Sequence, residues 1–201
     1  MSELGAILLA AGGSSRLGRS KQLLELNGES LVRRAARLLG DLTPHVTVVT
    51  GSRREAVEGE LAPLGLSLAH NERWREGVGS SISLGMERLP AEIRAVMVML
   101  CDQYRLETEH LDRLAENWRS APDRIVAARW ADAFGPPVIF PRRFFVQLRR
   151  LRGDLGARQL LVEQRARVLF MDLPSAGYDV DDPADLERMR AYEEGLNGVG
   201  G

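Results

Sequence analysis

The sequence predicts an α/β fold in which a mostly parallel central sheet is covered by helices on both faces. Two observations support this prediction. Short apolar runs alternate with segments of helical periodicity through the first half of the chain, and parallel strands need such helical crossovers. The apolar run AVMVML at 95–100 is the strongest strand signal, and a nearly all-apolar run is typical of a strand buried on both faces.

The N-terminal half predicts three strands, each followed by a helix. Each strand is a short run of apolar or β-branched residues, and each helix repeats its apolar positions at helical spacing. The first helix has Ser30 as its N-cap and Gly40 as its stop. The strands are expected at 5–10, 46–50 and 66–69, and the helices at 30–39, at 53–61 and up to Met86.

The C-terminal half is less regular. Thr108 is expected to cap one helix, and Pro183 stands at the favoured first position of the last helix. The tail at 196–201 is expected to fray. Strands are expected at 95–100, 125–128, 138–140 and 168–171, and helices at 108–118, at 156–163 and from Pro183.

Length and composition narrow the functional classes. With 201 residues and no linker rich in Pro, Gly or Ser, the chain is expected to form one domain, 1–201. The 27 Lys and Arg residues balance 28 Asp and Glu residues, so no global positive field favours nucleic acid. Cys101 is the single cysteine, which excludes an internal disulfide. Without a signal-like or membrane-length apolar run, we expect a cytoplasmic protein that contacts neither membrane nor nucleic acid.

A glycine-rich loop with three cations follows the first strand. Its sequence at 8–21 is LLAAGGSSRLGRSK, and its small residues let backbone N–H groups turn toward an anion. Arg16, Arg19 and Lys21 can neutralise several phosphate charges, although Arg19 could equally be a solvated loop residue. The loop has neither the lysine of a Walker A motif nor the G-x-G-x-x-G spacing of a dinucleotide site. It therefore predicts a triphosphate-binding loop.

Carboxylates stand where two further segments reach the same edge of the sheet. Asp102 directly follows the strongest strand, and extended geometry puts Asp179 and Asp181 on one side of the chain. Asp182, just before Pro183, is expected to cap the last helix. Because loops at the carboxyl ends of parallel strands converge, we expect these carboxylates near the glycine-rich loop.

Five segments together resemble the molybdenum cofactor nucleotidyltransferase family, the MobA-like enzymes with a Rossmann-like core of GT-A type. The resemblance covers nearly the whole chain and implies a three-layer α/β/α fold. Within this family the similarity is greatest to the cytidylyltransferase branch, since Ala11 stands where guanylyltransferases usually carry glycine. The segments are LLAAGGSSRLGRSKQLL at 8–24, NERWREGVGSS at 71–81, CDQ at 101–103, GDLGAR at 153–158 and DVDDP at 179–183.

The resemblance implies that CMP is transferred from CTP to the phosphate of molybdopterin, with release of pyrophosphate. It implies a nucleotide-binding half at about 1–105 and an acceptor-binding half at about 106–195. A Mg²⁺ ion would be held by Asp102 and by either Asp179 or Asp181, of which Asp181 is preferred, because this hard cation prefers oxygen ligands. Two departures concern the acceptor: Tyr104 replaces a common proline, and Pro136 stands where the family has histidine.

The expected site residues follow from this resemblance and from the motifs. Arg16, Lys21 and Asp102 are the catalytic candidates, with the cations stabilising the triphosphate and the leaving group. Asp154 is the candidate for binding the acceptor, although it could equally shape a turn. The nucleotide-binding candidates are Leu9, Ala10, Ala11, Gly12, Gly13, Ser14, Arg16, Lys21, Gly79, Ser80 and Ser81.

Other functions remain open at this stage. GTP could replace CTP, or the acceptor could be a sugar phosphate. A molybdenum apo-enzyme could be a further partner. In a different class, the chain could carry molybdenum cofactor without catalysis, but Lys21 and Asp102 argue against this because neither is needed merely to hold a pterin.

Overall fold

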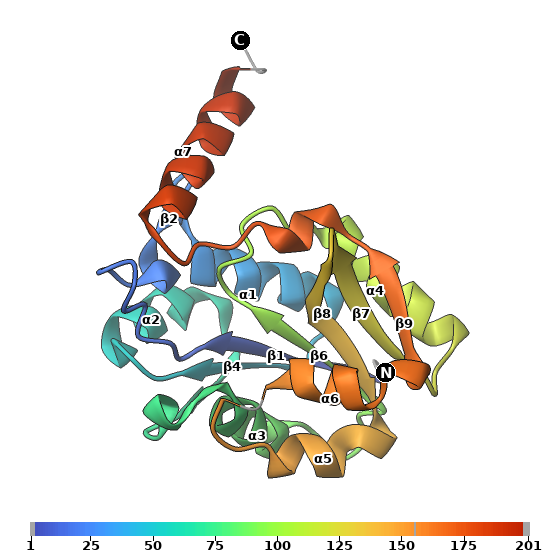
Figure 1. Ribbon diagram of the computed structural model, residues 1–201. Coiled ribbons are helices and arrows are strands. Elements are labelled where there is room, and N and C mark those ends of the chain that lie inside the picture. The colour runs from blue at the N-terminus through green and yellow to red at the C-terminus, as the bar shows by residue number, and fades with distance from the viewer. Residues whose placement is uncertain (1–2, 155, 199–201) are drawn as a thin grey trace.

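One seven-stranded sheet forms the centre of the computed structural model, which describes residues 3–154 and 156–198 (Figure 1). The strand order is β5-β4-β1-β6-β8-β7-β9, and only β8 runs antiparallel to its neighbours. A separate two-stranded ribbon joins β2 (Glu25–Leu26) to β3 (Glu29–Ser30). The strands of the main sheet are β1 (Leu4–Ala10), β4 (Val46–Thr50), β5 (Ser67–His70), β6 (Ala95–Leu100), β7 (Ile125–Trp130), β8 (Ala133–Pro141) and β9 (Val168–Asp172).

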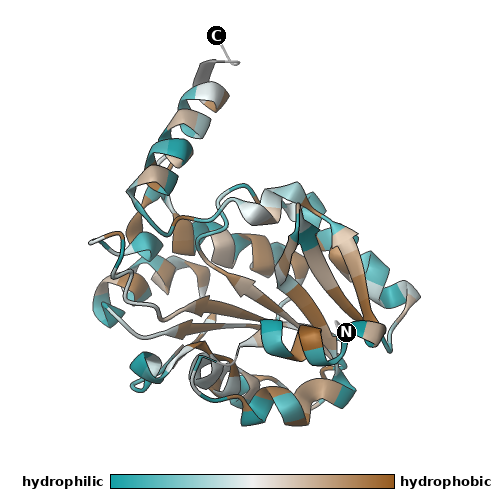
Figure 2. Cartoon of the chain, in the orientation of Figure 1, coloured by the Kyte–Doolittle hydropathy of each residue, from teal (hydrophilic) through white to brown (hydrophobic). Residues whose placement is uncertain are grey.

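Helices cover both faces of this sheet, and apolar residues lie on the strands between them (Figure 2). Successive residues of β1 point to opposite layers: Leu8 packs in the core beside α1, α2 and α4, and Ile7 packs beside α3, α5 and α6. This alternation confirms the predicted three-layer fold. The helices are α1 (Leu31–Leu42), α2 (Arg54–Leu61), α3 (Val78–Arg88), α4 (Thr108–Ser120), α5 (Phe145–Arg150), α6 (Ala157–Glu163) and α7 (Pro183–Gly198).

Several expected element boundaries are wrong. Gly40 does not stop α1, which continues to Leu42 because Leu38 and Leu39 keep the helix buried. Thr108 begins α4 but does not cap it: Glu107 is the N-cap residue, and its N–H donates to Nδ1 of His110 at 3.0 Å. The Ser30 cap is confirmed, since its Oγ accepts a hydrogen bond from the N–H of Arg33.

The second half also departs from the predicted pattern. The brief strand expected at 138–140 is part of the nine-residue β8, which pairs with both β6 and β7. Helix α7 continues through Gly198, and residues 199–201 of the tail expected to fray lie outside the described residues. The first turns of α7 pack through Leu186 and Met189, and the helix then extends away from the sheet (Figure 1).

The sheet topology brings the carboxyl ends of three parallel strands to one edge. Strands β1, β4 and β6 run parallel, with Leu9 paired to Leu100 and Ala10 paired to Thr50. Their carboxyl ends therefore deliver the glycine-rich loop and Asp102 side by side. Across residues 3–154 and 156–198, no helix combines the length and apolar character needed to cross a membrane.

The close packing of α3 on β1 can be tested at Gly85. A Cβ at this position would lie 2.7 Å from Cγ2 of the fully buried Ile7. We expect Gly85→Val to lower the free energy of unfolding by about 1–3 kcal/mol through overpacking. Urea denaturation measures the change. The control is Gly59→Val in α2, where no atom lies within 4 Å of an added Cβ; equal stability of the two variants would contradict the packing account.

Candidate functional site

Three carboxylates from two distant segments meet at the carboxyl edge of the sheet. Asp102 follows β6 and is 2% exposed, whereas Asp179 and Asp181 come from the segment before α7. One oxygen from each of the three lies within 4.8 Å of the others. Carboxylate oxygens are the ligands that hard divalent cations prefer, so the donor set fits such an ion.

Cationic side chains from the glycine-rich loop reach into this cluster. Lys21 Nζ pairs with Asp102 Oδ2 and lies 2.9 Å from Asp181 Oδ1. Arg16 Nη2 lies 2.8 Å from Asp181 Oδ2, with its side chain 73% exposed. Within the described part of the chain, Asp179 forms no ion pair. The Lys21 ammonium therefore lies among the carboxylates as their counter-cation. Its position supports the inference that these carboxylates could hold a metal ion.

The pKa directions show that this cluster attracts positive charge. Burial alone lowers the pKa of Lys21, but the Asp102 carboxylate and then Asp181 reverse this and hold it above its ordinary value. Burial opposes ionisation of Asp181, but Lys21 and Arg16 still lower its pKa. Burial, and then the negative charge of Asp102, raise the pKa of Asp179. Lys21 and Arg16 thus pair with Asp102 and Asp181, whereas none of the ion pairs among the described residues involves Asp179.

Gln22 organises the glycine-rich loop from inside. Its side chain is 1% exposed, and its Nε2 donates to the carbonyls of Ala10 and Gly12 at 3.1 and 2.6 Å. Its Oε1 accepts from Ser20 Oγ at 2.7 Å, and Ser14 Oγ accepts from the N–H of Lys21 at 3.1 Å. Gln22 was not among the predicted site residues. These bonds fix the loop so that Lys21 faces Asp102.

A cavity of about 170 Å³ opens between the loop and the acidic cluster. Residues of the predicted phosphate loop and Asp102 both line this cavity. Trp74 forms one wall, and an added Cβ on Gly13 would lie 2.8 Å from its ring, so the loop rests on this tryptophan. The lining residues are Leu9, Ala11, Gly12, Lys21, Gln22, Trp74, Val78, Ser81, Leu100, Cys101 and Asp102.

The segment at 71–81 is held by a buried hydrogen-bond network. Asn71 Nδ2 donates to Ser80 Oγ at 2.8 Å and to Ser81 Oγ at 2.9 Å, and Ser80 Oγ donates to the Gly77 carbonyl. The N–H of Gly79 donates to the Gly153 carbonyl at 2.9 Å. Ser81 lines the cavity, whereas Ser80 and Gly79 are engaged within the protein and shape the segment.

A second, more apolar cavity of about 480 Å³ adjoins the first. Leu9, Val78 and Leu100 line both, so the two spaces share a wall. Asp154 and Pro136 line the second cavity, at the positions that the sequence analysis connected with the acceptor. The backbone at Gly77 has a φ of 114° and approaches Gly153 so closely that a Cβ would lie 2.2 Å from the Gly153 carbonyl carbon. This glycine contact fixes the rim of the cavity.

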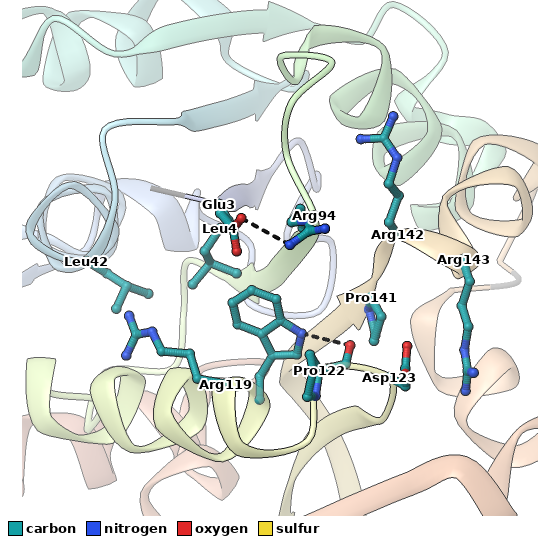
Figure 3. Close-up of a pocket in the computed structure, with 11 residues that line it drawn as sticks. Glu3, Leu4, Leu42, Arg94, Arg119, Pro122, Asp123, Pro141, Arg142 and Arg143 are labelled. Atoms are coloured by element: carbon teal, nitrogen blue, oxygen red, sulfur yellow. Dashed lines mark hydrogen bonds and ion pairs between the residues drawn. The ribbon is translucent and has the colours of Figure 1, made fainter. Parts of the chain in front are cut away.

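The large cavity of about 910 Å³ shown in Figure 3 lies elsewhere, beside the start of β1 and the end of α4. Two of its arginines are engaged locally. Arg94 pairs with Glu3 at 3.2 Å, and Arg142 donates to the Ile93 carbonyl at 2.7 Å. Figure 3 shows the arginines pointing in different directions rather than toward one point. This cavity therefore lacks the convergent charges found beside Asp102.

The structure brings together most of the predicted site residues. The three carboxylates form one cluster with Lys21 and Arg16. The predicted site residues that line the first cavity are Leu9, Ala11, Gly12, Lys21, Ser81 and Asp102. Asp154 lines the second cavity. Arg19 forms no ion pair within the described residues. The supporting polar residues Gln22 and Asn71 were not among the predicted site residues. The signal that could have identified them is an amide side chain within a glycine-rich segment.

The sheet order, the phosphate loop and the acidic cluster define the chain as a nucleotidyltransferase with a Rossmann-like core. The sequence model of the MobA-like NTP transferase domain matches residues 6–168, so the chain belongs to that family.

Named relatives match nearly the full chain. "Purine catabolism protein PucB" of Bacillus subtilis (strain 168) is 28% identical over 197 residues, covering 92% of this chain and 94% of that protein. A "probable molybdenum cofactor guanylyltransferase" of Nostoc sp. is 28% identical over 193 residues, covering 92% and 90%. The crystal structure of Rv0371C of Mycobacterium tuberculosis in complex with manganese has a TM-score of 0.77 and 25% identity, covering 94% of this chain and 98% of that one.

The metal role of the acidic cluster can be tested with Mn²⁺. We expect Asp102→Asn to weaken Mn²⁺ binding by at least about tenfold, because it removes the buried carboxylate of the cluster. Titration followed by electron paramagnetic resonance measures free Mn²⁺. The control is Asp172→Asn, whose exposed carboxylate pairs with Arg129 outside the site. Unchanged Mn²⁺ affinity in Asp102→Asn would remove this carboxylate from the metal site.

Proposed function

We propose that the protein is a Mg²⁺-dependent cytidylyltransferase that transfers CMP from CTP to the phosphate of molybdopterin and releases pyrophosphate. Its family membership and its relatives named molybdenum cofactor guanylyltransferase support the reaction and the acceptor class. The observation that carries the proposal is the placement of Lys21 against Asp102 and Asp181, at the end of the glycine-rich loop. The reaction is placed in the cytoplasm, where nucleoside triphosphates are available.

The chemistry needs charge and alignment rather than a protein nucleophile. The acceptor phosphate attacks the α-phosphorus of the nucleotide, and pyrophosphate leaves with increased negative charge. A Mg²⁺ ion bound by Asp102 and Asp181, with Asp179 as a further candidate ligand, would neutralise phosphate oxygens and stabilise the leaving group. Lys21 and the three carboxylates are already close together in the structure, and Lys21 and Asp102 line the cavity.

Lys21 and Arg16 bind the triphosphate in this proposal. In the structure both cations rest on Asp181, at distances of 2.9 and 2.8 Å. Asp102 and Asp181 would hold the metal ion, whose positive charge would compensate these carboxylates. Lys21 would then be free to turn toward the phosphates, where its compact ammonium acts as a point charge. Arg16 is largely exposed and can follow with its planar fork. In this proposal Asp102 and Asp181 therefore hold Lys21 and Arg16 close to the phosphate site before the nucleotide binds.

The base and the acceptor are assigned to the two adjoining cavities. The half at about 1–105 binds the nucleotide, with Ala11, Gly12 and Ser81 lining the space beside the phosphate loop. The half at about 106–195 binds the acceptor in the apolar cavity that Pro136, Asp154 and Gly156 line. Its predominantly apolar wall suits a flat heterocycle with a few polar edges, as a pterin has.

Base choice is tested at Ala11. Its side chain is 6% exposed, and its carbonyl accepts from the N–H of Ser52 at 3.0 Å, so its Cβ has a fixed position beside the cavity. We expect Ala11→Gly to lower the ratio of kcat/KM for CTP to that for GTP severalfold, because the added space admits a larger base. The control is Ala6→Gly in the preceding strand β1, at a buried position that does not line the cavity. An unchanged ratio would exclude Ala11 as a determinant of base choice.

The function itself is tested by pyrophosphate release with molybdopterin and Mg²⁺, comparing CTP, GTP and ATP with blanks that lack acceptor. We expect acceptor-dependent release that is fastest with CTP. Fastest release with GTP would instead assign the protein to the guanylyltransferases, as the name of the Nostoc relative suggests. Absence of release with every nucleotide, from protein that binds molybdopterin, would favour a carrier of molybdenum cofactor.

A further inference from the structure

The residues that follow Asp102 connect it to the segment that carries the other two carboxylates. Gln103 Nε2 donates to the Ala176 carbonyl at 2.8 Å and to the Pro136 carbonyl at 2.7 Å. Ala176 lies three residues before Asp179. A single buried amide thus links the metal-site loop after β6, the β8 hairpin and the segment before α7.

Tyr104 makes the next connection. Its side chain is 2% exposed and lies in the apolar cluster that holds Val180, between Asp179 and Asp181. Its ring centroid is 6.3 Å from that of Tyr178 and 5.7 Å from that of Tyr192 in α7. Tyr104 is the residue at which this chain departs from the common proline. Here it packs directly against the neighbours of the two aspartates.

Arg105 completes the set by lying among the three tyrosine rings. Its guanidinium carbon is 3.7 Å from the centroid of Tyr178, 4.5 Å from that of Tyr192 and 5.7 Å from that of Tyr104. Its Nε is buried and has no hydrogen-bond partner among the described residues. The tyrosine rings are therefore the main contacts of this side of the guanidinium. Tyr178 directly precedes Asp179.

We propose that Arg105 is a positioning residue, which acts through Tyr178 and Tyr192 to hold Asp179 and Asp181 at metal-binding distance from Asp102. This inference rests on the metal role proposed for the acidic cluster. The two sides of that cluster are far apart in the chain, and the described ion pairs that join them directly run through the displaceable Lys21. The contact of Arg105 with the tyrosines does not involve Lys21. It therefore keeps the carboxylates together after Lys21 turns toward a triphosphate.

A residue that only anchors α7 would give a different result from one that positions the carboxylates. Loss of a mere anchor lowers thermal stability but leaves the metal affinity of the folded protein unchanged. Loss of a positioning residue weakens metal binding in folded protein. A lysine at this position keeps the cation near the rings but lacks the planar guanidinium, so it is expected to restore part of the affinity.

The test is Mn²⁺ titration of Arg105→Ala, Arg105→Lys and wild type, without nucleotide, at a temperature where each is folded by circular dichroism. We expect Arg105→Ala to weaken Mn²⁺ binding about tenfold, as is typical for residues that orient metal ligands, and Arg105→Lys to lose less. The control is Arg113→Ala, an exposed arginine of α4, which should bind as wild type does.

A second variant covers the case in which Arg105→Ala does not fold. Tyr178→Leu removes the nearest ring at a position that is 37% exposed, and it should weaken Mn²⁺ binding similarly. Wild-type Mn²⁺ affinity in folded Arg105→Ala, or in Tyr178→Leu if the former is unfolded, overturns the proposal. Failure of the transferase assay leaves this measurement unaffected, whereas absence of Mn²⁺ binding by the wild type would refute the metal role itself.

Discussion

Lys21 Nζ lies between Asp102 and Asp181, and this ion-pair cluster joins three parts of the chain that are far apart in sequence. A carboxylate as buried as Asp102 needs a positive partner, because desolvation without one is costly. The glycine-rich loop supplies that partner, and Gln22 fixes the loop that presents it. The position of the loop, the end of β6 and the segment before α7 all depend on this pairing.

The same constraint prepares the site for its chemistry. Catalysis by positioned charges gains most when the charges are in place before the substrates bind. Three carboxylates and two cations form one cluster, whose members Asp102 and Lys21 line a cavity. The apolar cavity next to it shares three lining residues with the first. A metal ion would then replace Lys21 at carboxylates that are already in place, and the triphosphate would bind the lysine. No disordered loop would have to fold when these ligands bind.

Local patterns were enough to predict the mostly parallel sheet and the convergence of Asp102 with the glycine-rich loop and the later aspartates. The strand at 95–100 and the parallel pairing of β1 follow from apolar runs and from the alternation of strands with helices, which can be seen in neighbouring residues. Other features depend on tertiary contacts. The continuation of α7, the burial of Ser80 within a network from Asn71, and the place of Arg105 among three tyrosines arise from residues up to 87 positions apart, as between Arg105 and Tyr192. No local spacing signals them.

The most direct test of the account is Mn²⁺ affinity in wild type and Lys21→Met, each with and without CTP. If Lys21 is the resident counter-cation, Lys21→Met binds Mn²⁺ more tightly than wild type without nucleotide, because an ammonium no longer competes for the carboxylates. CTP then increases Mn²⁺ affinity less in the variant than in wild type, because the variant lacks the lysine that contacts the phosphates. Equal Mn²⁺ affinities of the two proteins in both conditions would contradict the exchange of Lys21 between the carboxylates and the triphosphate.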